Sequence, residues 1–206
     1  MNDEIRKGET LLIRDRIKEP VQDNVELFFN HFGRYYHAMK RLVISDQDVV
    51  IDASCGCGYG SYGLAKKAKQ VFGLDVNTTY LEIARKNLIL PNLSFMSYES
   101  FWYTCVQADK IFCIETFEHI PADQNEEFLG NLVRRLRGSG AMFLTTPLGN
   151  NGPSEYNPFH CFEPSIDVLY VMLSRYFGSI DMEVDTFTNS FGFLCKFASV
   201  LLRNKR

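Results

Sequence analysis

The sequence predicts an α/β fold: a doubly wound sheet of seven mostly parallel strands, in which the last strand runs antiparallel. Short apolar runs alternate with segments of helical period, which is typical of a parallel sheet covered by helices on both faces. No helix separates the last two runs, so these two strands must pair as a hairpin. Ligands bind such sheets at the carboxyl ends of the strands, so polar residues that directly follow a strand are the candidate site residues.

Seven strands are predicted from short apolar runs. Two of the first runs end in an aspartate, Asp52 and Asp75, and a polar turn at Asn189 joins the final pair. In chain order the predicted strands cover residues 48–52, 70–75, 93–96, 110–114, 141–146, 180–185 and 193–202.

Helices are predicted between the strands, and residue types at their ends support them. Apolar residues recur at helical spacing over residues 21–42. Asn77 and Ser165 can cap the helices that follow them, and Asp123-x-x-Glu126 has the pattern of a capping box that opens a helix to Arg135. The glycines at 138 and 140 are expected to end that helix. We expect one domain over residues 1–206, with residues 1–45 as an N-terminal helical cap.

Composition limits the classes of partner. The net charge of -3 and pI near 5.8 argue against a nucleic-acid partner. The six cysteines contain no C-x-x-C pair, so neither a zinc ribbon nor a thioredoxin motif is present. The charged first residues and the lack of an apolar run of ~18 residues predict neither a signal peptide nor a membrane span. We therefore expect a cytoplasmic protein without a membrane partner, of an oligomeric state that the sequence does not reveal.

A glycine-rich turn follows the first strand and reads Asp-Ala-Ser-Cys-Gly-Cys-Gly-Tyr-Gly from Asp52 to Gly60. Gly56 and Gly58 allow the backbone to approach a ligand closely. Asp75 ends the next strand, where a carboxylate can accept hydrogen bonds from both hydroxyls of a ribose. These features predict a nucleoside-binding site.

Two cofactor classes use such a turn. Gly58-x-Gly60-x-x-Gly63 matches the dinucleotide fingerprint, but it begins several residues after the strand ends, where the first glycine should follow at once. A G-x-G-x-G register over positions 54, 56 and 58 lies closer to the strand and is the pattern of S-adenosylmethionine (SAM) sites. Ser54 stands in the place of the first glycine, where a small residue fits if its φ is negative.

Several motifs together resemble the class I SAM-dependent methyltransferases. The resemblance covers nearly the whole chain and implies a Rossmann-like fold, SAM as cofactor and methyl transfer to an oxygen or nitrogen of a small-molecule acceptor. The motifs that carry it are Arg34-Tyr35, residues 50–61, Gly73-Leu-Asp75, residues 83–87, Glu115-Thr-Phe-Glu-His-Ile-Pro121, residues 134–140, Leu144-Thr-Thr-Pro147, Asn157-Pro-Phe-His160 and Glu163-Pro164.

The resemblance also implies roles for residues around the turn. Asp52, Ser54, Gly56 and Gly58 would form the part that holds the methionine end of SAM, with Asp75 on the ribose. Glu99 stands where the family places an acid that meets the adenine amino group; the alternative is an exposed loop glutamate. Arg34 could reach the methionine carboxylate as a charge-assisted pair, or be a solvated helix arginine.

Glu115, Glu118 and His119 directly follow the fourth predicted strand, and their spacing clusters them if the turn is helical. This pattern resembles the metal site of the ubiquinone-pathway O-methyltransferases and of the small-RNA 2′-O-methyltransferases, which add a later histidine. His160 would be that fourth ligand. A divalent metal ion is therefore a second implied cofactor, and it would lower the pKa of an acceptor hydroxyl.

A metal-free interpretation stays open, in which His119 or His160 is the general base and Glu118 orders the loop. Glu118, His119 and His160 are thus the candidate catalytic residues under either interpretation. Three other functions also stay open: an RNA 2′-O-methyltransferase with a metal site, a catalytically silent partner subunit with the same fold, and an NAD-dependent oxidoreductase.

Overall fold

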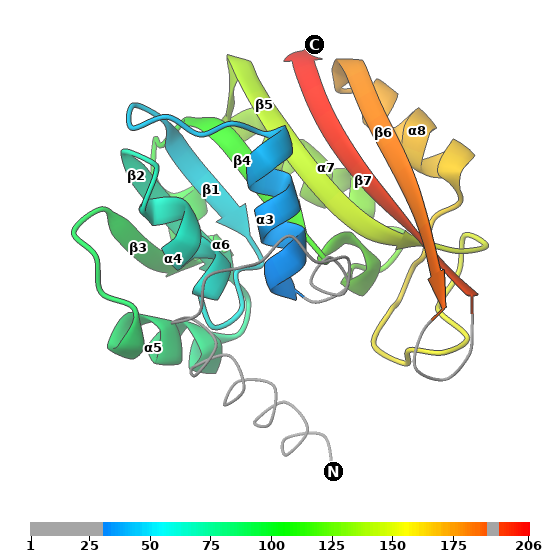
Figure 1. Cartoon of the computed structure of the whole chain (residues 1–206), viewed down its shortest axis with the longest axis horizontal. Helices are drawn as coiled ribbons and strands as arrows, with labels where there is room; N and C mark the ends of the chain where they lie inside the picture. The colour runs from blue at the N-terminus through cyan, green and yellow to red at the C-terminus, as the bar shows by residue number, and fades with distance from the viewer. Residues whose placement is uncertain (1–30, 189–193) are drawn as a thin grey trace.

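A seven-stranded sheet in the order β3-β2-β1-β4-β5-β7-β6 forms the centre of the protein (Figure 1). The computed structural model describes residues 31–188 and 194–206, so the turn at Asn189 and the start of the helix predicted over 21–42 lie outside the described residues. The strands are β1 Val49–Ala53, β2 Gln70–Asp75, β3 Leu93–Ser97, β4 Ala108–Ile114, β5 Leu136–Leu148, β6 Phe177–Thr188 and β7 Leu194–Lys205. Only β7 runs antiparallel to its neighbours, which confirms the predicted fold class.

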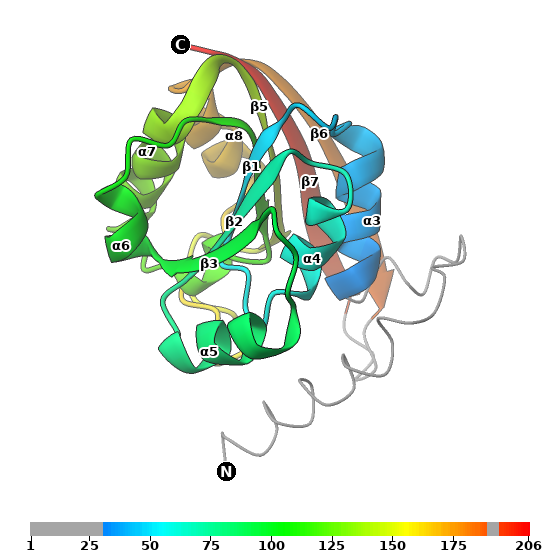
Figure 2. The same ribbon diagram turned by 90° about the vertical axis from the view of Figure 1, so that its left-hand side faces the viewer.

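Helices cover both faces of the sheet (Figure 2). α3 and α4 pack on one face, and α6, α7 and α8 pack on the other, while α5 packs beside β3. A 3₁₀ turn, η1, follows β4. The bounds are α3 His31–Arg41, α4 Tyr59–Ala65, α5 Thr78–Asn87, α6 Tyr98–Trp102, η1 Phe117–His119, α7 Asn125–Arg135 and α8 Ile166–Ser174.

Alternate residues of the central strands enter different cores. In β4, Ile111 and Cys113 pack beneath α7 and α8, whereas Phe112 and Ile114 pack beneath α3 and α4. All four side chains are buried. A strand with apolar residues on both faces is stable only between two layers of helices, which is why this short apolar run becomes a central parallel strand.

The predicted helix caps are partly confirmed. Asn77 Oδ1 accepts hydrogen bonds from the amides of Thr79 and Tyr80, and Ser165 Oγ accepts one from Val168. The capping box at Asp123 is wrong, because α7 starts only at Asn125 after Gln124, whose side chain makes no cap bond. The Gln124 amide instead donates to the Pro121 carbonyl at 2.9 Å, so a separate turn occupies the predicted first residues.

The glycines at 138 and 140 do not form the loop that ends α7. They lie in β5, which begins at the buried Leu136 and pairs there with Ala108 of β4. Burial of Leu136 in the core draws the chain into the sheet directly after Arg135. Within the described residues, we find no helix with the length and apolarity that a membrane crossing requires.

Candidate cofactor and acceptor sites

The turn between β1 and α4 is held in place by Asp75 at the end of β2. Asp75 Oδ2 accepts a hydrogen bond from the Gly56 amide at 2.8 Å, and Oδ1 accepts one from the Asn77 amide at 2.8 Å. Gly56 and Gly58 have φ of 54° and 84°, the left-handed region that glycine tolerates. A carboxylate has about four acceptor positions, so Asp75 keeps acceptor capacity for hydroxyls of a ligand.

Asp52 supports the turn from inside the protein. It is fully buried, and its two carboxylate oxygens accept hydrogen bonds from the Tyr35 hydroxyl at 2.7 Å and the Ser61 hydroxyl at 2.6 Å. Burial raises the pKa of Asp52 to about 7. Asp52 is among the residues predicted to form the cofactor site; with no exposed surface, it acts on the turn and not on a ligand directly.

Ser54 adopts a φ of 61°, so the condition of a negative φ, under which a small residue fits here without strain, is not met. A residue with a Cβ in the left-handed region costs about 1–3 kcal/mol. The Ser54 hydroxyl lies 3.0 Å from the Tyr98 hydroxyl at the start of α6, and this hydrogen bond offsets part of that cost. Serine is therefore accommodated in the glycine position through a side-chain contact.

We expect Ser54→Ala to destabilise the protein by about 1–3 kcal/mol, because it keeps the left-handed strain and leaves the part-buried Tyr98 hydroxyl without its partner. Ser54→Gly loses the same hydrogen bond but relieves the strain, so its effect should stay within about 1 kcal/mol of zero. Urea unfolding of both variants measures the difference, and equal destabilisation would contradict a strained Ser54.

The two other predicted cofactor residues differ in their surroundings. Glu99 is exposed in the first turn of α6, directly after β3. Arg34 is largely buried and pairs with Glu115 Oε2 at 2.8 Å, and its guanidinium lies 4.6 Å from the centre of the Phe197 ring. Arg34 is therefore not a solvated helix arginine, and its charge is committed to Glu115 instead of the cofactor turn.

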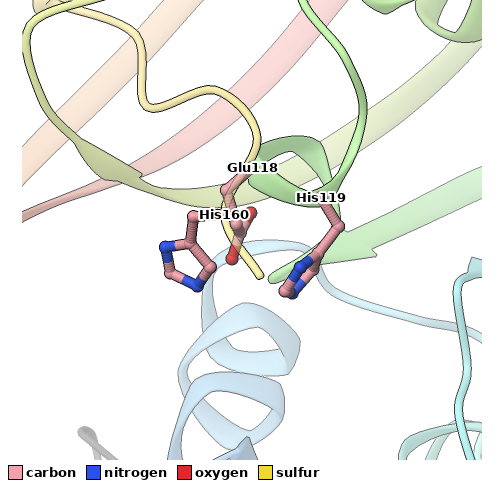
Figure 3. A group of neighbouring side chains, drawn as sticks. All are labelled: Glu118, His119 and His160. Atoms are coloured by element: carbon pink, nitrogen blue, oxygen red, sulfur yellow. The ribbon is translucent and has the colours of Figure 1, made fainter. Parts of the chain in front are cut away.

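Three candidate catalytic residues come together beyond the end of β4. Glu118 and His119 belong to η1, and His160 lies in the loop after β5 (Figure 3). One donor atom of each lies within 4.8 Å of the donor atoms of the other two. The amides of Cys161 and Phe162 donate to the Glu118 carbonyl at 2.7 and 3.1 Å, which anchors the loop against η1.

Hydrogen bonds fix the orientation of both imidazoles. The ring nitrogen Nδ1 of His119 lies 2.9 Å from the Phe159 carbonyl, which can only accept, so Nδ1 donates and Nε2 is the acceptor nitrogen of the neutral ring. Nδ1 of His160 lies 2.6 Å from Glu163 Oε1, and its Nε2 lies 2.8 Å from Asn157 Nδ2. The Nε2 atom of His119 is therefore oriented for proton transfer or metal binding, whereas Nε2 of His160 accepts from Asn157 and must exchange that partner before it binds a proton or a metal.

Glu118 is buried, and one of its oxygens has no partner. Oε2 accepts a hydrogen bond from Thr146 at 3.2 Å, whereas Oε1 makes no hydrogen bond with any residue that the structure describes. Burial raises the pKa of Glu118 well above its usual range, and the nearby Glu115 carboxylate adds to this effect. The site therefore favours a proton or a cation at Glu118.

Glu115, the remaining predicted ligand, lies outside the group of three because its carboxylate is engaged elsewhere. It accepts one hydrogen bond from the Thr145 hydroxyl at 2.9 Å and pairs with Arg34. Burial raises its pKa, while Arg34 acts in the opposite direction. Its φ of 51° places this residue in the left-handed region directly after β4.

Tyr35, Ser61, Asn157 and Glu163 lie within the motifs that carry the resemblance, but no supporting role was predicted for them. The spacing of His160-x-x-Glu163 was the one available signal, since residues three apart can meet within a turn. Nothing in the sequence indicated that Tyr35 would reach Asp52.

Comparison with known proteins agrees with the predicted class. Residues 50–140 match a family model described as a methyltransferase domain. A probable S-adenosylmethionine-dependent methyltransferase of Mycobacterium tuberculosis is 28% identical over 128 residues, which cover 60% of this chain and 46% of that protein. A ubiquinone biosynthesis O-methyltransferase of Azoarcus sp. is 30% identical over 102 residues, 47% of this chain and 43% of that protein.

An uncharacterized RNA methyltransferase of Listeria innocua is 38% identical over 66 residues, 32% of this chain and 15% of that protein. The chain thus spans less than half of the length of each of these relatives. Among solved structures, the magnesium protoporphyrin IX methyltransferase of Synechocystis PCC 6803 with bound SAH has a TM-score of 0.64 at 16% identity, with 94% of both chains covered. At this identity the likeness shows a shared fold.

The strand order and the sequence match define the class of protein. Residues 50–140 match the methyltransferase domain family, and the sheet has the fold that this chain shares with a solved methyltransferase. Both findings agree with the class of SAM-dependent methyltransferases that the resemblance implied.

Proposed function

We propose that the protein binds SAM at the turn of Ser54 to Gly58 and Asp75, and transfers the methyl group to an oxygen or nitrogen of a small-molecule acceptor. The observation that carries the proposal is the position of two sites on one edge of the sheet. The turn and Asp75 follow β1 and β2, and the group of Glu118, His119 and His160 follows β4 and β5. Cofactor and acceptor would meet between them.

The residues around Asp75 fit a nucleoside. Asp75 has acceptor capacity for the ribose hydroxyls, and Val76 directly after it is 81% exposed, so an apolar surface is available to an adenine ring. Glu99 is exposed after β3, where its carboxylate could accept from the adenine amino group. Gly56 and Gly58 would let the backbone approach the methionine part.

SAM supplies an activated methyl group on a sulfonium sulfur. The protein has to position the acceptor, which is worth roughly 7–11 kcal/mol, and to remove a proton if the acceptor is a hydroxyl or amine. His119 Nε2 is the proposed proton acceptor, because the Phe159 carbonyl holds the ring in the matching tautomer. His160, oriented by Glu163, is the alternative base, and in that role its Nε2 exchanges the Asn157 amide for the acceptor's proton.

A divalent metal ion is the second cofactor that we propose. The donor set fits a cation: the buried Glu118 Oε1 lacks a partner, and the carboxylate and two imidazoles lie together. Such an ion would lower the pKa of an acceptor hydroxyl. This mixed oxygen and nitrogen set does not discriminate between magnesium, manganese and zinc.

The acceptor is proposed to be a small molecule because the net charge is -3 and the pI is near 5.8. The 30% identity over 102 residues to an O-methyltransferase supports oxygen as the acceptor atom. RNA is the alternative acceptor, which the identity to an RNA methyltransferase over 66 residues keeps open. A cytoplasmic location and a single domain over residues 1–206 stay predictions.

The test combines binding and turnover. Calorimetric titration with S-adenosylhomocysteine (SAH), the demethylated product, should show binding to the free protein. Transfer of labelled methyl from SAM should then be followed with phenols, catechols and amines, and with RNA in parallel. Labelling of RNA alone would overturn the small-molecule proposal. SAH binding without any methyl transfer would favour the catalytically silent partner subunit. Absence of SAH binding would overturn the proposed cofactor site.

We expect His119→Ala to lower turnover by roughly 10²–10⁴-fold, because the general base is lost, while SAH affinity stays within about twofold of wild type. His37→Ala is the matched control, since His37 lies on α3 beside Glu183 of β6. Equal turnover of His119→Ala and wild type would exclude His119 as the base, and His160→Ala then tests the alternative.

The metal proposal predicts that Glu118→Gln abolishes binding of Mn²⁺ or Zn²⁺ in calorimetric titration, because the variant cannot supply a buried carboxylate to the ion. Glu115→Gln should retain binding if three residues hold the ion, since Glu115 is paired with Arg34. Loss of binding in both variants would indicate a four-residue site. No binding by the wild type, with turnover insensitive to chelator, would overturn the proposal.

A further inference from the structure

Three segments meet at the buried carboxylate of Asp52. Tyr35 donates to it from α3, Ser61 donates from α4, and Asp52 itself lies near the end of β1, two residues before Ser54. Both oxygens are occupied, and the side chain has no exposed surface. The start of the cofactor turn is therefore fixed by a hydroxyl from a helix that lies outside the β1–turn–α4 unit.

The Tyr35 ring is closely packed, in addition to the hydrogen bond that its hydroxyl makes. A Cβ built on Gly60 would lie 2.2 Å from the Tyr35 ring atom Cζ, so only glycine at this position lets the ring lie against the first turn of α4. The ring also contacts Tyr59 edge to face, with 5.6 Å between centroids. Ring packing and the hydrogen bond to Asp52 are separate contributions, and removal of the hydroxyl leaves the first intact.

The neighbour of Tyr35 in the chain contacts the other half of the site. Arg34 reaches Glu115 after β4, on the side of the proposed acceptor. Two consecutive residues of α3 thus contact the structure that supports the cofactor turn and the residue that follows β4. The position of α3 is consequently tied to both proposed binding regions.

We infer that Tyr35 is a positioning residue for cofactor binding, whose hydroxyl holds Asp52 and, through it, the turn from Ser54 to Gly58. This inference rests on the proposed binding of SAM at that turn. Tyr35 does not contact the acceptor-side residues that we propose for proton transfer, so its loss should affect the cofactor more than the chemistry.

The first test is Tyr35→Phe, which removes one oxygen and keeps the ring. We expect the dissociation constant of SAH to rise by about tenfold, since a hydrogen bond to a buried carboxylate is lost. Tyr62→Phe on α4 is the matched control, because Tyr62 contacts Lys66 instead of Asp52, and SAH affinity should not change. A thermal melt of each free variant verifies folding.

A pH profile separates positioning from a general loss of structure. Burial raises the pKa of Asp52 to about 7, whereas the hydrogen bonds from Ser61 and Tyr35 both lower it, so Tyr35→Phe should raise it further. Ionised Asp52 accepts from both hydroxyls, so SAH affinity should increase as pH rises through this pKa, with a higher midpoint in the variant. The titratable groups that face Asp52 are Tyr35, Cys55, Tyr59, Asp75 and Cys113.

Burial raises the pKa of both cysteines and both tyrosines among these groups, so they stay neutral near pH 7, and the nearby Asp75 carboxyl adds to the raised pKa of Asp52. If wild type binds SAH and Tyr35→Phe has the same affinity and pH midpoint, the inference is wrong while the proposed function stands. Equal loss in Tyr62→Phe would also overturn it. If wild type does not bind SAH, the proposed function itself fails.

Discussion

Asp75→Asn is expected to weaken SAH binding by roughly 100-fold, the largest effect of any single substitution on the proposed cofactor. The carboxylate accepts from the amides of Gly56 and Asn77 and, in the proposal, from both ribose hydroxyls. Asparagine replaces one acceptor oxygen by a donor, which faces either the Gly56 amide or a hydroxyl. Loss of charge-assisted hydrogen bonds worth about 1.5–3 kcal/mol accounts for the expected factor.

Asp109→Asn is the matched control for this substitution. Asp109 is a part-buried aspartate of the same sheet that accepts from the Val49 amide at 2.9 Å and pairs with Arg137, but it lies at the amino end of β4. SAH titration of both variants, with a melt of each free protein, should show lost affinity in Asp75→Asn alone. A change below about threefold in Asp75→Asn would mean that the sugar is not bound there.

Strands could be predicted where a short apolar run is buried on both faces of the sheet. Ile111 to Ile114 are apolar and buried on both faces, and such a short run between polar turns fits only a strand covered on both sides. Asn77 was predictable as a cap because its side chain can satisfy free amides at the start of a helix. Both signals are local, so they can be recognised in the sequence.

Elements whose bounds depend on tertiary pairing were less predictable. α6 spans 5 residues and η1 spans 3, too few to show a period. β6 and β7 each span 12 residues, longer than predicted, because hairpin pairing continues from Phe177 with Lys205 to Thr188 with Leu194. That extension is a property of the pair and is not visible in either strand alone.

The candidate site also contains contacts that could be predicted from the sequence and contacts that could not. The grouping of Glu118, His119 and His160 was expected from a resemblance, and the structure brings them together. The pairing of Arg34 with Glu115 was not expected, because it depends on where α3 packs on the face of the sheet. Contacts between segments far apart in sequence follow from packing, which residue spacing does not encode.

Gly58→Ala is expected to destabilise the protein by roughly 2–6 kcal/mol, the largest effect on folding among the substitutions considered. Gly58 has a φ of 84°, which a residue with a Cβ adopts at a cost of about 1–3 kcal/mol. The added Cβ would also lie 2.5 Å from the Phe95 ring. Phe95 is 6% exposed and packs with Leu81 and Ala84, so overpacking adds about 1–3 kcal/mol.

Gly63→Ala tests whether that cost comes from the position and not from the change of residue. Gly63 lies inside α4, and no atom lies within 4 Å of a Cβ built on it. Alanine is preferred over glycine by about 0.5–1 kcal/mol within a helix, so this variant should be more stable than wild type. Urea unfolding should therefore give shifts of opposite sign for the two alanines. A Gly58→Ala variant as stable as wild type would show that the cofactor turn does not hold the left-handed backbone on which the proposed approach to SAM depends.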